Sequence, residues 1–395
     1  MDESSIIKIL SGRKLSELHF LPEPELLEIL ELEDCNMDAP EVFSRLPNLR
    51  ELTFNGVALN DLQFLPELYN LEELHINGDI GSLQGISRMP CLQKLWIYCP
   101  LNKQALDLSP LSGMDSLRQV TLHTDFIDVS GIPALNSLEE LDLHGLFLKG
   151  TGALAHLRGL KKLAWVGEPD GLEFLPQLTN LETLAARADT VDKLPSLSAL
   201  DSLHTLSFNG KKLDISGLSG LRNLRRLYLS LECLQNSGVI SGFGKLEKLS
   251  INLGSSTGPL GGYFPLDSPH VNFLSGLSRL KNLKITAGNL SDIKGLCGLE
   301  ELEYLSLASG VLKNLEPLAG LKGLEVLELR GAFDDITPLA QLHQLRSLHL
   351  KSASLSNIEC IAGLENLEEL EVKSSGVDLN GLESLSRLKT LQIDR

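Results

Sequence analysis

The sequence has few aromatic residues and no long apolar run. Aromatic side chains make up 5% of the 395 residues, and only two of them are tryptophan. This composition is unlike that of an ordinary globular enzyme. The first residues, Met1-Asp-Glu-Ser-Ser, carry no basic group, and no apolar stretch of signal-peptide or membrane-span length follows them. We therefore expect neither a secretion signal nor contact with a membrane.

Motifs for catalysis and cofactor binding are also missing. The sequence contains no Walker loop and no H-E-x-x-H. The segment Gly150-Thr-Gly152 matches a relaxed dinucleotide pattern, but it falls in a turn and lacks the βαβ unit that such binding requires. We expect a protein that is not an enzyme, with no cofactor, no catalytic residues and no metal.

Positive charge is scarce and unevenly placed. The chain has 35 basic and 52 acidic residues, a formal charge of −17. Residues 1 to 75 hold 16 acidic and 5 basic side chains, whereas residues 156 to 295 hold 12 acidic and 16 basic ones. Nucleic acid is a poor candidate ligand, because phosphate binding needs a basic surface. We expect a protein partner with a basic surface, although the acidity alternatively serves only solubility.

Leucine, in contrast, accounts for 90 residues, and it recurs with a fixed period. We call the recurring position the anchor. Successive anchors are 21 or 22 residues apart, with two exceptions. Each anchor lies in the phrase L-x-x-L-x-L, as in Leu138-Glu-Glu-Leu141-Asp-Leu143. The seventeen anchors are Leu30, Leu52, Leu74, Leu95, Val120, Leu141, Leu163, Leu184, Leu206, Leu227, Leu249, Leu283, Leu305, Leu327, Leu348, Leu370 and Leu391.

The phrase predicts one short strand per repeat. Anchor and anchor+2 point inward, and the residues between them point outward, because side chains alternate across a strand. After each strand, apolar residues recur every third position, which favours 3-10 turns or coil over α-helix. The sequence thus predicts an α/β repeat fold, a solenoid with about 17 parallel concave strands and a thin convex backing. We expect residues 1–25 to form an N-terminal cap and residues 26–395 a single elongated domain.

The repeated phrase resembles the leucine-rich repeat family, over about residues 26 to 395. It is most similar to the 21/22-residue class of internalins and of phosphatase-regulatory subunits. Members of the family usually carry Asn or Cys at anchor+5. This chain has Cys35 there in the first repeat, but the other repeats carry other residues, as Val57 and Lys211 illustrate. Extracellular members often have cysteine-stapled caps. Since the six cysteines here are scattered, we expect a cytoplasmic location.

In such a solenoid the outward side chains are the ones available for binding. The third to sixth repeats place an unusual set of aromatic and histidine residues in the outward columns, a composition typical of interface hot spots. The alternative is an exposed cluster without a ligand. These candidate partner-binding residues are His75, Trp96, Tyr98, Thr121, His123, Asp142 and His144.

The two breaks in the period are further candidates. The spacing from Leu249 to Leu283 is 34, and the surplus falls in a Gly- and Pro-rich loop at about 252–270 that contains Tyr263 and Phe264. Long loops on one face of a repeat array often bind partners, although a surface insertion without a role is equally open. The spacing from Leu95 to Val120 is 25. Outward Arg226 and Tyr228 complete the predicted partner-binding set.

These features predict a non-catalytic module that binds a protein through its concave face, as a monomer when free. Inhibition of the partner, as by a bacterial immunity protein, is the leading interpretation. A regulatory or scaffold subunit that holds an enzyme such as a phosphatase is the alternative. A metal-dependent enzyme that uses His123, His144 and Asp142 is a distant third, because no further ligand or nucleophile converges on them.

Overall fold

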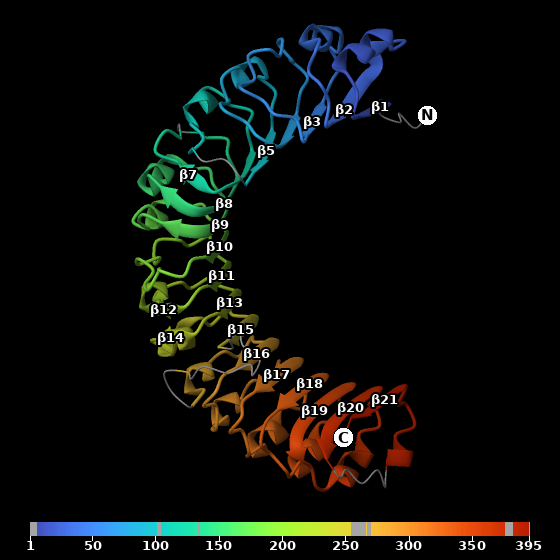
Figure 1. Cartoon of the computed structure of the whole chain (residues 1–395). Coiled ribbons are helices and arrows are strands. Elements are labelled where there is room, and N and C mark those ends of the chain that lie inside the picture. Colours follow the sequence, from blue (N-terminus) through green and yellow to red (C-terminus); the bar gives the residue numbers. More distant parts are fainter. Residues whose placement is uncertain are drawn as a thin grey trace. The chain divides into compact units, whose positions relative to one another are not determined.

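A computed structural model describes residues 6–100, 104–132, 135–253, 266, 270–375 and 382–394. The chain divides into two compact units, Met1–Ala188 and Asp189–Arg395. In each unit most of the strands lie side by side on the concave side, and the 3-10 turns lie on the convex side (Figure 1). This arrangement confirms the predicted repeat architecture for each unit taken by itself.

Unit 1 contains a parallel sheet that runs in chain order from β1 to β10. Each strand pairs with the next, except that β6 and β7 both pair with β8. The strands are β1 (Ile6–Ser11), β2 (Leu27–Glu33), β3 (Glu51–Asn55), β4 (Glu73–Asn77), β5 (Lys94–Cys99), β6 (Gln119–Thr124), β7 (Phe126–Asp128), β8 (Glu140–Lys149), β9 (Lys162–Pro169) and β10 (Thr183–Arg187).

Unit 2 repeats the arrangement. Its parallel strands are β11 (Thr205–Asn209), β13 (Arg226–Ser230), β15 (Lys248–Asn252), β16 (Asn282–Thr286), β17 (Tyr304–Ala308), β18 (Val326–Arg330), β19 (Ser347–Ser354), β20 (Glu369–Ser375) and β21 (Thr390–Asp394). A separate pair of short strands, β12 (Lys212–Asp214) and β14 (Cys233–Gln235), lies beside them.

The turns are 3-10 helices, as the spacing of three predicts, and the described residues include no α-helix. In unit 1 they are η1 (Leu15–Phe20), η2 (Pro24–Leu26), η3 (Pro40–Arg45), η4 (Ile86–Arg88), η5 (Ser109–Leu111), η6 (Thr151–His156) and η7 (Leu175–Gln177). In unit 2 they are η8 (Ile215–Leu218), η9 (Ser237–Gly242), η10 (Asn272–Leu274), η11 (Lys294–Leu296), η12 (Glu316–Gly320), η13 (Thr337–Gln341), η14 (Ile358–Gly363) and η15 (Leu382–Ser384). No helix in the described ranges has the length and apolar character needed to cross a membrane.

All seventeen anchors lie in strands, and sixteen of them are buried. The exception is Leu391 on β21, which is 49% exposed. Trp165, at an anchor+2 position, is buried in the core as its inward register predicts. Neighbouring strands align anchor with anchor, for example Leu305 with Leu327. The outward columns are therefore rows of adjacent side chains.

Hydrogen bonds from asparagine side chains link successive coils at anchor−4, and not at the anchor+5 position usual in the family. Asn48, Asn70, Asn180, Asn223 and Asn366 each donate to a backbone carbonyl of the preceding coil, at 2.7 to 2.9 Å. These bonds satisfy carbonyl groups that would otherwise lack partners at the turn. At anchor+5, Cys35 and Ser375 also donate to a carbonyl of the preceding coil, but the repeated asparagine bonds lie at anchor−4.

At the N-terminal edge, β1 extends the sheet of unit 1 by pairing in parallel with β2. Leu10, Leu15 and Leu18 are buried there, whereas Ile7 and Phe20 are exposed. The segment therefore covers part of the first coil and leaves some apolar surface open. The capping role of residues 1–25 and the single-domain organisation stay predictions.

Candidate functional site

Four neighbouring strands of unit 1 bring the predicted aromatic and histidine residues together. The register aligns one row across β4, β5, β6 and β8 at anchor+1, and a second row at anchor+3. The first row is His75, Trp96, Thr121 and Asp142, and the second is Asn77, Tyr98, His123 and His144. All seven candidates from these repeats therefore lie on one patch, which we call the aromatic face.

The rings of the aromatic face contact one another in a chain. Trp96 and Tyr98 stack with ring centroids 5.9 Å apart and an interplanar angle of 8°. His75 lies 6.1 Å from Trp96 on one side, and His123 lies 5.7 Å from Tyr98 on the other. His123 and His144 then stack at 3.9 Å with an angle of 9°. Five rings thus form a continuous surface.

These rings are open to solvent to different degrees. Tyr98 is 39% exposed, and Trp96 and the three histidines are half-buried. Thr121 is nearly buried between the larger side chains, so it shapes the surface and offers little contact area. Because the rings pack against one another, their rotamers are already restricted in the free protein. Less side-chain entropy is therefore lost when a partner binds.

Charges at the edge of the aromatic face are paired. Asp142 Oδ1 lies 2.8 Å from Nε2 of His144, and Glu73 lies 3.5 Å from His75 and 2.7 Å from Nζ of Lys94. The hydrogen bond from Lys94 lowers the pKa of Glu73, so this carboxylate stays ionised. Burial, and then the neighbouring His144, lower the pKa of His123. At neutral pH the His123 ring is therefore uncharged.

The arrangement suits binding better than catalysis. Stacked imidazoles lie in parallel planes, so their nitrogens do not converge on one point as metal ligands must. Within the described ranges, no group of three or more His, Cys, Asp or Glu side chains is placed to hold a metal ion. Indole, phenol and neutral imidazole rings instead offer apolar area together with a few hydrogen-bonding groups.

The structure adds an apolar rim that the sequence columns did not predict. Phe126 on β7 and Phe147 on β8 stack at 6.2 Å, and both are exposed, as is Leu146. They lie beyond the strand positions on which the outward columns were built. The signal in the sequence was the pair of adjacent large apolar residues, Leu146 and Phe147, directly after the repeated phrase. The coils of β6 and β8 thus contribute both histidines and phenylalanines.

The remaining candidates are not on this patch. Arg226 and Tyr228 lie on β13 of unit 2, where both side chains are exposed on the open sheet face. Tyr263 and Phe264 lie outside the described residues, as do most of the 252–270 loop and residues 101–103. The candidate set is therefore one compact patch in unit 1 and a pair of residues in unit 2.

No protein-family model matches this sequence, and no curated protein matches it. Solved structures do match. The internalin inlF of Listeria monocytogenes has a TM-score of 0.55 and 20% identity, covering 91% of this chain and 90% of that chain. A leucine-rich repeat protein of Leptospira interrogans has a TM-score of 0.60 and 20% identity, covering 98% and 94%.

A chain of the Drosophila Toll–Spätzle complex has a TM-score of 0.71 and 18% identity, covering 94% of this chain and 54% of that chain. Similarity at this level of identity establishes the fold. The protein has the leucine-rich repeat fold, as its repeated phrase predicts.

Proposed function

We propose that this protein is a non-catalytic binding module that holds a protein partner against the aromatic face. The observation that carries the proposal is the unbroken chain of five rings from His75 to His144. The residues that contribute most binding energy cluster near the centre of an interface and are enriched in Trp and Tyr, together with Arg. The exposed Phe126–Phe147 pair adds apolar area on the same coils.

The charge of unit 1 supports a basic partner. Glu31, Glu51 and Glu73 lie on the open sheet face of β2, β3 and β4, next to the aromatic face. Residues 1 to 75 carry 16 acidic and 5 basic side chains. Such a surface accelerates the approach of a basic protein and repels nucleic acid. The Toll chain named above was solved in complex with Spätzle, which agrees with a protein as the partner.

We further propose that binding inhibits the partner, in the manner of an immunity protein. A rigid sheet face covers the surface that it binds, and coverage of an active site is sufficient for inhibition. The free protein is expected to be monomeric and cytoplasmic. A regulatory subunit would instead leave its partner active or redirected.

The test begins with capture of partners from the native cell by the wild-type protein and by two variants. Trp96→Ala removes the central ring, whereas Tyr69→Ala removes an exposed ring that lies in a turn. The partner of interest is one that the wild type and Tyr69→Ala retain and Trp96→Ala loses. Its activity is then measured with increasing wild-type protein. Unchanged or increased activity would contradict inhibition, and equal capture by all three proteins would contradict the proposed surface.

A further inference from the structure

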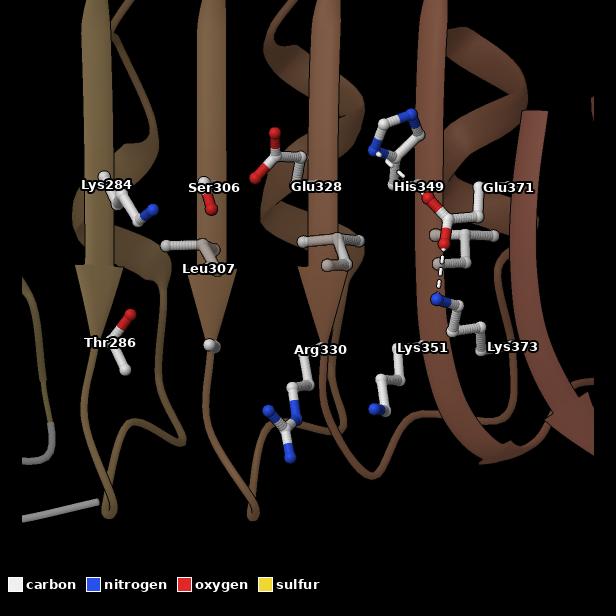
Figure 2. Close-up of a pocket in the computed structure, with 13 residues that line it drawn as sticks. Lys284, Thr286, Ser306, Leu307, Glu328, Arg330, His349, Lys351, Glu371 and Lys373 are labelled. Carbon is white, nitrogen blue, oxygen red and sulfur yellow. Dashed lines mark ion pairs between the residues drawn. The ribbon is translucent and has the colours of Figure 1, made fainter. Parts of the chain in front are cut away.

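The open sheet face of unit 2 is hollowed where short side chains lie between long ones. On β17 the outward residues that follow Tyr304 are Ser306 and Ala308, which are small. The strands on either side carry Lys284 and Thr286 on β16, and Glu328 and Arg330 on β18. The result is a hollow of about 290 Å³ above β17. Figure 2 shows Lys284 and Glu328 pointing toward each other across Ser306.

Two further hollows adjoin this one. One of about 360 Å³ extends over β11, β13, β15 and β16, and another of about 320 Å³ lies between Tyr228 and Tyr304. Lys284 lines all three hollows, and Ser250 lines two of them. They therefore form one shallow groove that crosses the strands from β11 to β19 and ends at Glu371 and Lys373 of β20. We call it the Lys284 groove. Ser207, Ser230, Ser250, Ser306 and Ala308 are its short side chains.

The Lys284 groove is positively charged although the chain as a whole is acidic. From β13 to β19 the outward side chains include five cations and one carboxylate. The cations are Arg226, Lys248, Lys284, Arg330 and Lys351, and the carboxylate is Glu328. Arg226 lies beside the groove and not in its lining, whereas Glu371 and Lys373 of β20 also line its end. Among the described residues, Arg226, Lys248, Lys284 and Lys351 have no ion-pair partner.

On the next strand, β20, the charged side chains of the same face are paired with one another. Lys373 on β20 lies 2.7 Å from Glu371 and 3.3 Å from Asp394 (Figure 2 shows the first pair). In the sequence, Lys351 on β19 and Lys373 on β20 occupy the same outward position of their repeats. The structure separates them: the pairing of Lys373 is internal, whereas Lys351 faces solvent at the end of the groove.

We propose that the Lys284 groove binds an extended acidic segment of a protein partner. Unpaired cations in a row are complementary to carboxylates spaced along a chain. The groove crosses seven strands, so six intervals of about 4.8 Å give a length of about 29 Å. An extended segment of roughly nine residues spans that length. Side chains of Asn209, Asn252 and the groove serines are placed to hydrogen-bond its backbone.

A peptide fits these residues better than single-stranded nucleic acid does. Phosphates are evenly spaced and cannot avoid Glu328 within the groove or Glu371 at its end, whereas a peptide can place neutral residues there. Among the described residues, the rings that line the groove are Tyr228, Tyr304, His349 and the buried Phe208, which are few for stacking a row of bases. This inference concerns unit 2 and does not depend on the aromatic face.

The probe is a fluorescent nine-residue peptide of alternating Glu and Ser, compared with the same peptide carrying Gln for Glu. Binding to the full chain is measured by anisotropy at 50 mM and 150 mM salt. We expect the Glu peptide to bind, more weakly at the higher salt, and the Gln peptide to bind at least about ten-fold more weakly. No binding of the Glu peptide at 1 mM and low salt, or equal binding of both peptides, would overturn the proposal.

Charge-matched variants locate the contact. Lys284→Glu should weaken binding of the Glu peptide by about ten-fold or more, because Lys284 lines every part of the groove. Lys313→Glu makes the same charge change at an exposed position of unit 2 outside the groove, and its effect should be about two-fold at most. Equal effects of the two variants would mean nonspecific attraction, and would overturn the proposal.

Two controls complete the test. An unchanged melting temperature of Lys284→Glu shows that the loss is not one of folding, and Lys284→Gln, which removes the charge without reversing it, should show an intermediate affinity. Trp96→Ala should bind the Glu peptide as the wild type does, so failure of this inference is distinguishable from failure of the aromatic-face proposal. A nine-nucleotide single-stranded RNA is tested in the same way. If it binds more tightly than the Glu peptide, and if Lys284→Glu weakens its binding, the choice of a peptide is overturned.

Discussion

The aromatic face of unit 1 and the Lys284 groove of unit 2 are built on the same scaffold. Both lie on parallel strands of about five to ten residues that align anchor with anchor. Their inward residues are almost all apolar and buried, so the cores are alike. The outward columns differ: rings that stack on one another in unit 1, and serines between unpaired cations in unit 2. Surface chemistry in this fold therefore varies without change to the core.

The largest expected effect tests the shared scaffold. Leu305→Ala should lower the free energy of unfolding by about 2 to 5 kcal/mol, because it leaves a cavity in a stacked core. Leu141→Ala, at the equivalent anchor of unit 1, should cost a similar amount, whereas Ser306→Ala should cost almost nothing. Urea denaturation measures all three. Comparable losses from Leu305→Ala and Ser306→Ala would show that the inward and outward assignments are wrong.

The second effect separates the two faces by function. Trp96→Ala should weaken the affinity for the captured partner by at least about 30-fold, since truncation of a central aromatic ring typically costs about 2 kcal/mol or more. The melting temperature should stay the same, because the ring is outward and supports little core. Titration calorimetry with the purified partner measures the change. Wild-type affinity in this variant would refute the proposed role of the aromatic face.

A smaller effect concerns the charges that distinguish the two units. Glu72→Lys together with Glu73→Lys should slow association with a basic partner several-fold and flatten its salt dependence. Glu73 also binds Lys94, so the double variant leaves Lys94 without that partner. Glu325→Lys is the matched control for Glu72→Lys alone, because Glu325 occupies in unit 2 the place of Glu72 and faces Arg346 as Glu72 faces Arg50. Stopped-flow mixing should show little change for the control, and an equal slowing would mean that only net charge matters.

The smallest effect is a pH dependence confined to unit 1. The pKa of His123 is lowered in the folded state, first by burial and then by His144. The unfolded chain therefore binds more protons than the folded one as the pH falls through the ordinary histidine range near 6.5, and stability decreases there. His123→Gln should reduce this slope, and His156→Gln, at an exposed position in a turn, should not. Chemical denaturation between pH 5 and 8 gives the slopes, and identical slopes for wild type and His123→Gln would contradict the assignment.

Much of the aromatic face was predictable from spacing alone. Once Leu74, Leu95, Val120 and Leu141 are aligned as anchors, the rows across β4, β5, β6 and β8 follow, because parallel strands in register place equal offsets side by side. The 3-10 turns follow from apolar spacing of three. Phe126 and Phe147 were missed because they follow the short strand that the phrase predicts. Phe126 begins a separate strand, β7, and β8 continues to Phe147 with a register shift after His144, so the simple alternation of faces does not extend to them.

The amino-acid sequence by itself determined the period, the strands and the side of the sheet on which each residue lies, since these depend on neighbours a few positions apart. Contacts between coils join residues about 22 positions apart, and only the tertiary structure decided them. Whether His123 stacks on His144, or Lys373 pairs with Asp394 while Lys351 stays unpaired, depends on rotamers and on the packing of whole strands. The joining of three hollows at Lys284 depends on the same packing, because a groove is the space that several neighbouring side chains leave between them.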